Sequence, residues 1–170
     1  MSGRKWILLA EDNANDADLA MRALSASQAS GEIVLAADGA EALDCLYRRG
    51  GFQSRDDIPP AVVLLDLKMP RVDGLEVLRQ IKNDPALKHI PVVVFTSSQE
   101  RIDLIRTYQL GANAYVVKPL GFKEFVSVIK DVKQFWLVIN EPPPIDFKFP
   151  LESRPANLTA TGRRLDTIEK

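Results

Sequence analysis

Short, almost wholly apolar segments recur along the chain and alternate with longer stretches of helical period. These segments lie at residues 5–10, 32–36, 61–66, 90–96 and 114–117. Four of the five lack the polar alternation of a half-exposed strand, which is typical of parallel strands covered on both faces. The pattern therefore predicts five strands in a parallel sheet.

The intervals between these strands have the spacing of amphipathic helices. Apolar residues three or four apart mark one face of the first and third helices: Ala17, Ala20, Met21 and Leu24, then Val77, Leu78 and Ile81. The fourth helix is expected over about residues 99–110, and it should end at Gly111, which accepts a left-handed C-terminal cap.

The last helix is expected over about residues 122–139 and has the strongest apolar stripe: Phe122, Phe125, Ile129, Val132 and Trp136. Strand and helix alternate five times along the chain. This alternation implies right-handed crossovers and a three-layer, doubly wound (βα)5 sandwich of the α/β class.

The pattern changes after Ile139, where three consecutive prolines favour an extended conformation that cannot continue a helix. We expect a domain over residues 1–140 and an extended tail over residues 141–170. Four apolar residues of the tail would share one face of an extended strand: Ile145, Phe147, Phe149 and Leu151. Either the tail's own domain or a second subunit should cover this face.

A second subunit is the alternative that we favour. Val128 and Phe135 form an additional apolar stripe on the last predicted helix, and such a stripe is consistent with a homodimer surface. The tail would then serve as a dimerisation arm.

The composition is that of an ordinary globular protein and narrows the possible partners. The net charge is -1, with 46% hydrophobic and 26% charged residues, which gives no basic footprint for nucleic acid. No apolar run approaches the ~20 residues of a membrane span, and acids follow the amino-terminal apolar run too soon for a signal peptide. We therefore expect a cytoplasmic protein. The single cysteine, Cys45, excludes an internal disulfide, and one histidine makes a zinc site improbable.

The chemically distinctive residues follow the predicted strands. They are Glu11 and Asp12 after the first strand, Asp66 at the end of the third, Thr96 at the end of the fourth and Lys118 after the fifth. Ligands of open α/β sheets bind at the carboxyl ends of the strands. These side chains should therefore share one rim of the sheet.

Three carboxylates in one crevice repel one another unless a cation neutralises them. Oxygen ligands without Cys or His suit a hard ion, and a few carboxylates with waters and a phosphate are the usual ligands of Mg²⁺. Together with a lysine on the same rim, such an ion favours a dianionic group on an aspartate oxygen. The rim therefore predicts formation of an aspartyl phosphate. For Asp12 alone, a helix cap is the simpler alternative.

Four segments resemble the receiver domains of response regulators in two-component signalling: LLAEDN (8–13), VVLLDLKMPRVDGLEVLRQIK (62–82), IPVVVFTSS (90–98) and GANAYVVKP (111–119). The resemblance covers nearly all of residues 4–140. It implies a flavodoxin-like fold with strand order 2-1-3-4-5.

The resemblance also implies how the acidic residues act. Asp66 matches the phosphoacceptor. Asp12 and, through water, Glu11 match the acidic pair that holds Mg²⁺, and the backbone carbonyl of Lys68 matches a further ligand of the ion.

Four more residues match the family's pattern. Thr96 matches the hydroxyl that hydrogen-bonds the phosphoryl group, and Lys118 matches the ammonium that pairs with it. Pro119 matches a cis proline, and Tyr115 matches the aromatic switch that turns inward when Thr96 moves.

Within this family, the chain is similar to single-domain regulators of the kind that partner cyanobacterial phytochromes. The similarity is carried by EDNANDADL, by the long loop over residues 48–61 and by IKNDPALKHIPVVVFTSSQ. Related chains often have proline where this one has Ala14. The resemblance implies a phytochrome-type sensor histidine kinase as partner, and it adds weight to a C-terminal arm that embraces a second protomer.

Two other classes of function stay open. A Mg²⁺-dependent phosphohydrolase with an aspartate nucleophile also places an apolar strand before the acid, but it typically has a second acid two residues later, where this chain has Lys68. A pseudo-receiver would keep the fold as a binding module without the chemistry, and the intact Asp12, Asp66, Thr96 and Lys118 argue against it.

Overall fold

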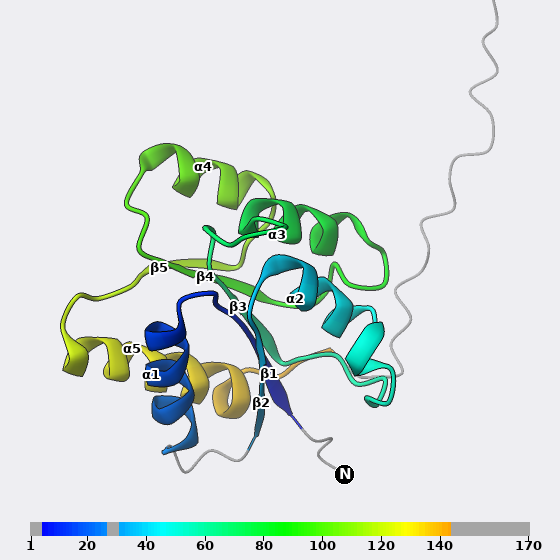
Figure 1. Ribbon diagram of the computed structural model, residues 1–170, viewed down its shortest axis with the longest axis horizontal. Coiled ribbons are helices and arrows are strands. Elements are labelled where there is room, and N and C mark those ends of the chain that lie inside the picture. Colours follow the sequence, from blue (N-terminus) through cyan, green and yellow to red (C-terminus); the bar gives the residue numbers. More distant parts are fainter. Residues whose placement is uncertain (1–4, 27–30, 144–170) are drawn as a thin grey trace, which may run out of the picture.

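The computed structural model describes residues 5–26 and 31–143 of the chain. These residues form one parallel sheet of order β2-β1-β3-β4-β5, which confirms the predicted fold. The strands are β1 (Trp6–Ala10), β2 (Glu32–Ala36), β3 (Val62–Leu65), β4 (Val92–Thr96) and β5 (Ala114–Val117). Helices cover both faces of the sheet, so the fold has three layers (Figure 1).

The helices divide between the two faces of the sheet. Helices α1 (Ala14–Ser25) and α5 (Phe122–Gln134) lie on one face, and α2 (Gly39–Leu46), α3 (Gly74–Asn83) and α4 (Arg101–Gln109) lie on the other (Figure 1). A short 3-10 turn, η1 (Gly50–Phe52), lies in the long loop before β3, and a π-helical turn, η2 (Phe135–Ile139), continues α5. The predicted last helix is therefore an α-helix that ends in a π turn.

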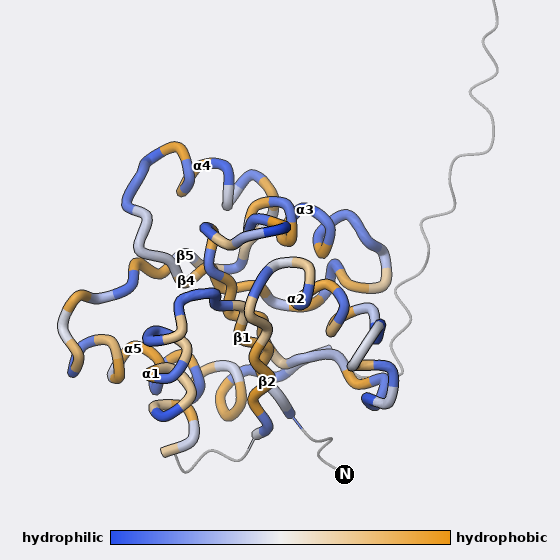
Figure 2. Tube along the Cα trace, viewed as in Figure 1, coloured by the Kyte–Doolittle hydropathy of each residue, from blue (hydrophilic) through white to orange (hydrophobic). Residues whose placement is uncertain are grey.

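The core consists of two hydrophobic clusters, one on each face of the sheet. In β1, Ile7 and Leu9 pack with α1 and α5, whereas Leu8 and Ala10 pack with α2 and α3. Every residue of β1, β3 and β4 is buried. Figure 2 shows these hydrophobic strands enclosed by helices with polar outer faces. Their sequences lack polar alternation because both faces of the sheet are covered.

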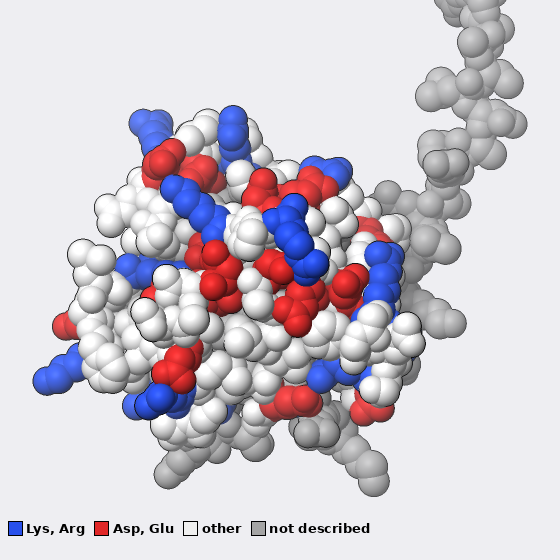
Figure 3. Space-filling view, in the orientation of Figure 1, with Lys and Arg blue, Asp and Glu red and all other residues white. Residues whose placement is uncertain are grey.

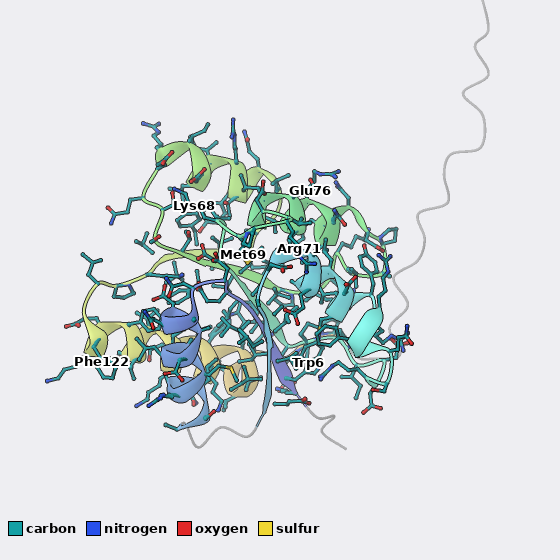
Figure 4. All side chains as sticks on the ribbon, in the orientation of Figure 1. Trp6, Lys68, Met69, Arg71, Glu76 and Phe122 are labelled. Atoms are coloured by element: carbon teal, nitrogen blue, oxygen red, sulfur yellow. The ribbon has the colours of Figure 1, made fainter. Side chains whose placement is uncertain are left out.

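The inner face of the last helix keeps Val132 and Trp136 of the predicted stripe, packed half-buried against the core, but differs at Phe122 and Lys133. Phe125 and Ile129 are buried, but Phe122 is 67% exposed and lies at the outer end of the helix (Figure 4). Lys133 is only 2% exposed, and its Nζ donates to the carbonyl oxygen of Leu24 near the end of α1. Helical period fixes which residues share a face, but not where the neighbouring elements end. A lysine stem can also pack as an apolar group.

The predicted outer stripe of the last helix is only partly present. Val128 packs, half-buried, against the cluster between the sheet and α1 and α5, so it adds little to an outer surface. Phe135 is exposed, and Val138 and Ile139 are exposed beside it in η2. The apolar surface at this end of the molecule therefore lies on the π turn.

The peptide bonds of the described residues are all trans, including the bond before Pro119. The prediction of a cis bond at Pro119 is therefore wrong. The trans form is favoured before most prolines by about 0.5–1 kcal/mol, so a matching motif does not by itself fix the isomer.

Candidate functional site

Asp66 continues the line of β3 past its last residue. Its N–H donates to the carbonyl oxygen of Ala10 in β1 at 3.0 Å, which holds Asp66 in register with the sheet. Gly74, the first residue of α3, lies against it: a Cβ at position 74 would stand 2.1 Å from the Asp66 carbonyl oxygen. The absence of a side chain at Gly74 therefore allows α3 to start beside the acid.

Glu11 and Asp12 lie on the same rim, directly after β1. One carboxylate oxygen from each of Glu11, Asp12 and Asp66 lies within 4.8 Å of the other two. Glu11 and Asp66 are buried and Asp12 is exposed, so the group opens to solvent on one side. Figure 3 shows acidic side chains gathered near the centre of this view. Three carboxylates at this spacing fit a hard divalent cation.

Lys118 brings a positive charge into this acidic group. Its Nζ donates to Glu11 Oε2 at 2.6 Å, to Asp66 Oδ2 at 2.8 Å and to Asp16 Oδ2 at 2.9 Å. Burial alone would lower the pKa of Lys118, but the hydrogen bonds to the three carboxylates raise it above its usual value. Burial raises the pKa of Glu11, and Lys118 opposes that rise. The ammonium is therefore charged at neutral pH and holds the site together.

Lys68 has a different position from Lys118. Its side chain is exposed and lies 3.8 Å from Glu100, whereas its backbone N–H donates to Asp66 Oδ1 at 3.3 Å. Figure 4 shows Lys68 on the loop that follows β3. The ammonium that contacts Asp66 is therefore that of Lys118, although Lys68 is nearer in sequence.

Asp16 is a site residue that the sequence analysis missed. It lies in the first turn of α1, where its N–H donates to the side chain of the N-cap residue Asn13. An acid in the first turn of a helix is common because it complements the helix dipole, so its type alone gives no signal. Its position one helical turn after Asp12 was the only clue that it could face the rim.

Thr96, at the end of β4, and Tyr115, in β5, are both hydrogen-bonded to the loop after β4. The Thr96 side chain is fully buried, and its Oγ1 accepts the N–H of Ser98 at 3.3 Å. The Tyr115 hydroxyl donates to the carbonyl oxygen of Ser98 at 3.0 Å. Ser98 in turn donates from its own hydroxyl to Asp103 in α4 at 2.6 Å. Ser98, which the sequence analysis did not single out, therefore connects Thr96 and Tyr115 to α4.

The chain resembles known proteins over nearly the whole described region. A family model described as the response regulator receiver domain matches residues 7–130. The chain is 44% identical over 138 residues to the probable methanogenesis regulatory protein FilR2 of Methanothrix harundinacea, which covers 81% of this chain and 86% of the relative. It is 38% identical over 133 residues to response regulator Rcp1 of Synechocystis sp., covering 78% of this chain and 89% of the relative.

Solved structures of response regulators also resemble this chain. The phosphorylated cyanobacterial phytochrome response regulator RcpA superposes with a TM-score of 0.78 at 37% identity, over 84% of this chain and 100% of that one. The Mn²⁺-bound form of Rcp1 superposes with a TM-score of 0.77 at 36% identity, over 82% of this chain and 99% of that one. The bacteriophytochrome response regulator RtBRR superposes with a TM-score of 0.67 at 53% identity, over 83% of this chain and 85% of that one. Within the described residues, no helix is long and apolar enough to cross a membrane.

Proposed function

Since this chain belongs to the response regulator receiver domain family, a family of signalling switches, we propose that Asp66 accepts a phosphoryl group from a sensor histidine kinase. The observation that carries the proposal is the surroundings of the Asp66 carboxylate. Asp66 Oδ2 accepts from the Lys118 ammonium at 2.8 Å, and one oxygen of its carboxylate lies within 4.8 Å of one oxygen each of Glu11 and Asp12. Nucleophile, counter-charge and metal-ligating acids thus meet at one rim.

The acidic group would hold Mg²⁺ through Glu11, Asp12 and Asp66, with the backbone carbonyl of Lys68 as a further ligand. Receiver domains bind Mg²⁺ or Mn²⁺ at such an acidic pocket, and Rcp1 has a Mn²⁺-bound structure. When bound, the ion supplies charge neutralisation for the transferring phosphoryl group.

The chain's own residues supply the remaining chemistry. A carboxylate oxygen of Asp66 forms the new bond to phosphorus as the bond from phosphorus to the kinase histidine nitrogen breaks. Lys118 donates to a phosphoryl oxygen, and the Thr96 hydroxyl donates to another. The new charge of nearly -2 draws Thr96 toward it, and the freed space lets Tyr115 leave Ser98 and turn inward.

This movement would change the surface formed by α4, β5 and α5, through which the protein signals. That surface carries exposed apolar side chains: Ile102, Ile105, Tyr108, Val117 and Leu120. Since the Ser98 N–H donates to Thr96 Oγ1 and the Ser98 hydroxyl donates to Asp103, a change at Thr96 reaches α4 through two hydrogen bonds. The output would be a protein contact made in the cytoplasm, and we propose no binding to nucleic acid or membrane.

The kinase would be of the phytochrome type, because RcpA is described as a phytochrome response regulator and RtBRR as a bacteriophytochrome response regulator. The exposed Phe135, Val138 and Ile139 in η2 would form part of a homodimer surface. The tail over residues 141–170 would complete it as an arm on the second protomer, although its apolar residues 145–151 lie outside the described residues.

Acetyl phosphate and intact-mass spectrometry test the phosphoacceptor directly. Wild-type protein with Mg²⁺ should gain one phosphoryl group, and Asp66→Asn should gain none. A full adduct on Asp66→Asn would contradict the proposal. A panel of histidine kinases, with phytochrome-type kinases among them, then tests the partner, since the fastest transfer should come from that class.

Two alternatives lack the support that the switch has. A phosphohydrolase would use an acid two residues after the nucleophile, and the residue there is Lys68, whose exposed side chain lies near Glu100. A binding module without chemistry would not need a buried lysine held by three carboxylates.

A further inference from the structure

Asp16 contacts Lys118, and the proposed phosphorylation chemistry does not use it. Its Oδ2 accepts from Lys118 Nζ at 2.9 Å. The Asp16 side chain is 36% exposed, against 2% for Glu11 and 8% for Asp66. In the described part of the chain, the carboxylate of Asp16 forms an ion pair with Lys118. Asp16 is thus the most accessible of the three acids on the ammonium.

The hydrogen bonds of Lys118 are fully used in this structure. An ammonium group has three N–H donors. Those of Lys118 go to Glu11, Asp16 and Asp66. A phosphoryl group on Asp66 brings three strong acceptor oxygens and a charge of nearly -2, and it needs one of these donors. It must therefore compete for them with the carboxylates that accept them now.

The exposure of the three acids decides which of them yields a donor of Lys118 at the least cost. Glu11 is buried, and removing its partner would leave a charged group without compensation in a dry environment. Asp66 carries the phosphoryl group itself, so the donor that it accepts now can pass to a phosphoryl oxygen, and the two remaining competitors are Glu11 and Asp16. Asp16 can exchange Lys118 for water at little cost because more than a third of its side chain is exposed.

We propose that Asp16 is a positioning residue that competes with the phosphoryl group for Lys118. It holds the ammonium in place while Asp66 is free, and it weakens the hold of the site on a phosphoryl group once one is attached. The inference rests on the proposed phosphoacceptor function. It assigns to the first turn of α1 a part in setting how long the phosphorylated state lasts.

Beryllofluoride, a non-covalent mimic of a phosphoryl group on an aspartate, provides the test, with affinity measured by calorimetry at fixed Mg²⁺. Asp16→Ala and Asp16→Asn should bind it about five- to tenfold more tightly than wild type, because a charge-assisted competitor for Lys118 is gone or weakened. Asp18→Asn is the matched control. It removes the same charge from the same helix, but Asp18 pairs with Arg22 at the exposed surface, so affinity should stay within about twofold.

The conservative variant Asp16→Glu separates positioning from a loosening of α1. It keeps a carboxylate near Lys118 and should bind beryllofluoride within about twofold of wild type. Equal tightening in Asp16→Ala, Asp16→Asn, Asp16→Glu and Asp18→Asn would overturn the inference, and so would unchanged or weaker binding in Asp16→Ala. Circular dichroism verifies the fold of each variant.

Acetyl phosphate labelling of the same proteins separates the inference from the function on which it rests. If wild type gains one phosphoryl group but the Asp16 variants bind beryllofluoride no more tightly, only the competition of Asp16 is refuted. If wild type neither gains a phosphoryl group nor binds beryllofluoride, the phosphoacceptor function fails, and the role of Asp16 fails with it.

Discussion

The substitution Gly74→Ala tests how closely α3 must approach Asp66. The added Cβ would stand 2.1 Å from the Asp66 carbonyl oxygen, 2.6 Å from Leu67 Cα and 2.9 Å from the Asp66 carbonyl carbon. All three are backbone atoms, so no side-chain rotation relieves the contact. The first turn of α3 or the end of β3 must move by more than an ångström.

The cost of this movement decides the sign of the effect on stability. Overpacking against groups that cannot rearrange costs about 1–3 kcal/mol. Alanine is the better helix former and returns at most about 1 kcal/mol, less at a helix terminus. The net loss should be about 1–2 kcal/mol of unfolding free energy, or roughly 3–8 °C in Tm for a domain of this size.

Thermal unfolding followed by circular dichroism measures the loss of stability, and acetyl phosphate uptake reports the displacement of Asp66. Uptake by Gly74→Ala should be slower than in wild type, because the nucleophile shifts relative to Lys118. Gly51→Ala is the control: a Cβ there meets no atom within 4 Å, so its effect should stay within about 0.5 kcal/mol. A Gly74→Ala variant that melts at the wild-type temperature and labels at the wild-type rate would refute the reasoning.

Three further predictions concern other parts of the molecule. Burial raises the pKa of the Cys45 thiol from 9.0 to about 11, so the unfolded chain loses this proton at lower pH and the contribution of Cys45 to stability declines as pH rises from 9 to 11. Urea unfolding should show this decline in wild type and not in Cys45→Ala. Mg²⁺ at 100 times its Kd should stabilise wild type by about 2.7 kcal/mol in thermal unfolding, and Asp12→Asn should lose most of that gain. Deletion of residues 142–170 should convert a dimer to a monomer in light scattering, because the proposed arm is removed.

Each of these predictions has an outcome that contradicts it. If the unfolding free energy falls equally with pH in wild type and Cys45→Ala, the alkaline loss of stability comes from groups other than Cys45. An equal Mg²⁺ shift in Asp12→Asn would remove that residue from the ligand set, and an unchanged mass after the deletion would remove the tail from the dimer interface.

The strands and the rim could be predicted from sequence because each follows from a short-range rule. The runs around Leu8, Val63 and Val93 lack polar residues because both faces of the sheet are covered. Each run can be recognised from about five consecutive residues of the sequence. Glu11 and Asp66 could be placed together because parallel strands end on the same edge.

The features that were missed depend on where elements end and on groups distant in sequence. Phe122 has the period of an inner residue but lies at the outer end of α5, and Lys133 is polar but finds the carbonyl oxygen of Leu24. Asp16 reaches Lys118 across 102 residues. Such contacts follow from the packing of α1 against α5 and from the position of Lys118 after β5, which no local pattern encodes.

The reactivity of two buried lysines reports whether the domain is folded. Amine-acylating reagents need a free, accessible amino group, and Lys118 and Lys133 have their ammonium groups enclosed in the folded domain. The exposed Lys68, Lys88 and Lys123 offer no such protection. Peptide mapping after brief acylation therefore reads two regions at once. Modification at Lys133 reports separation of α1 from α5, and modification at Lys118 reports opening of the acidic rim.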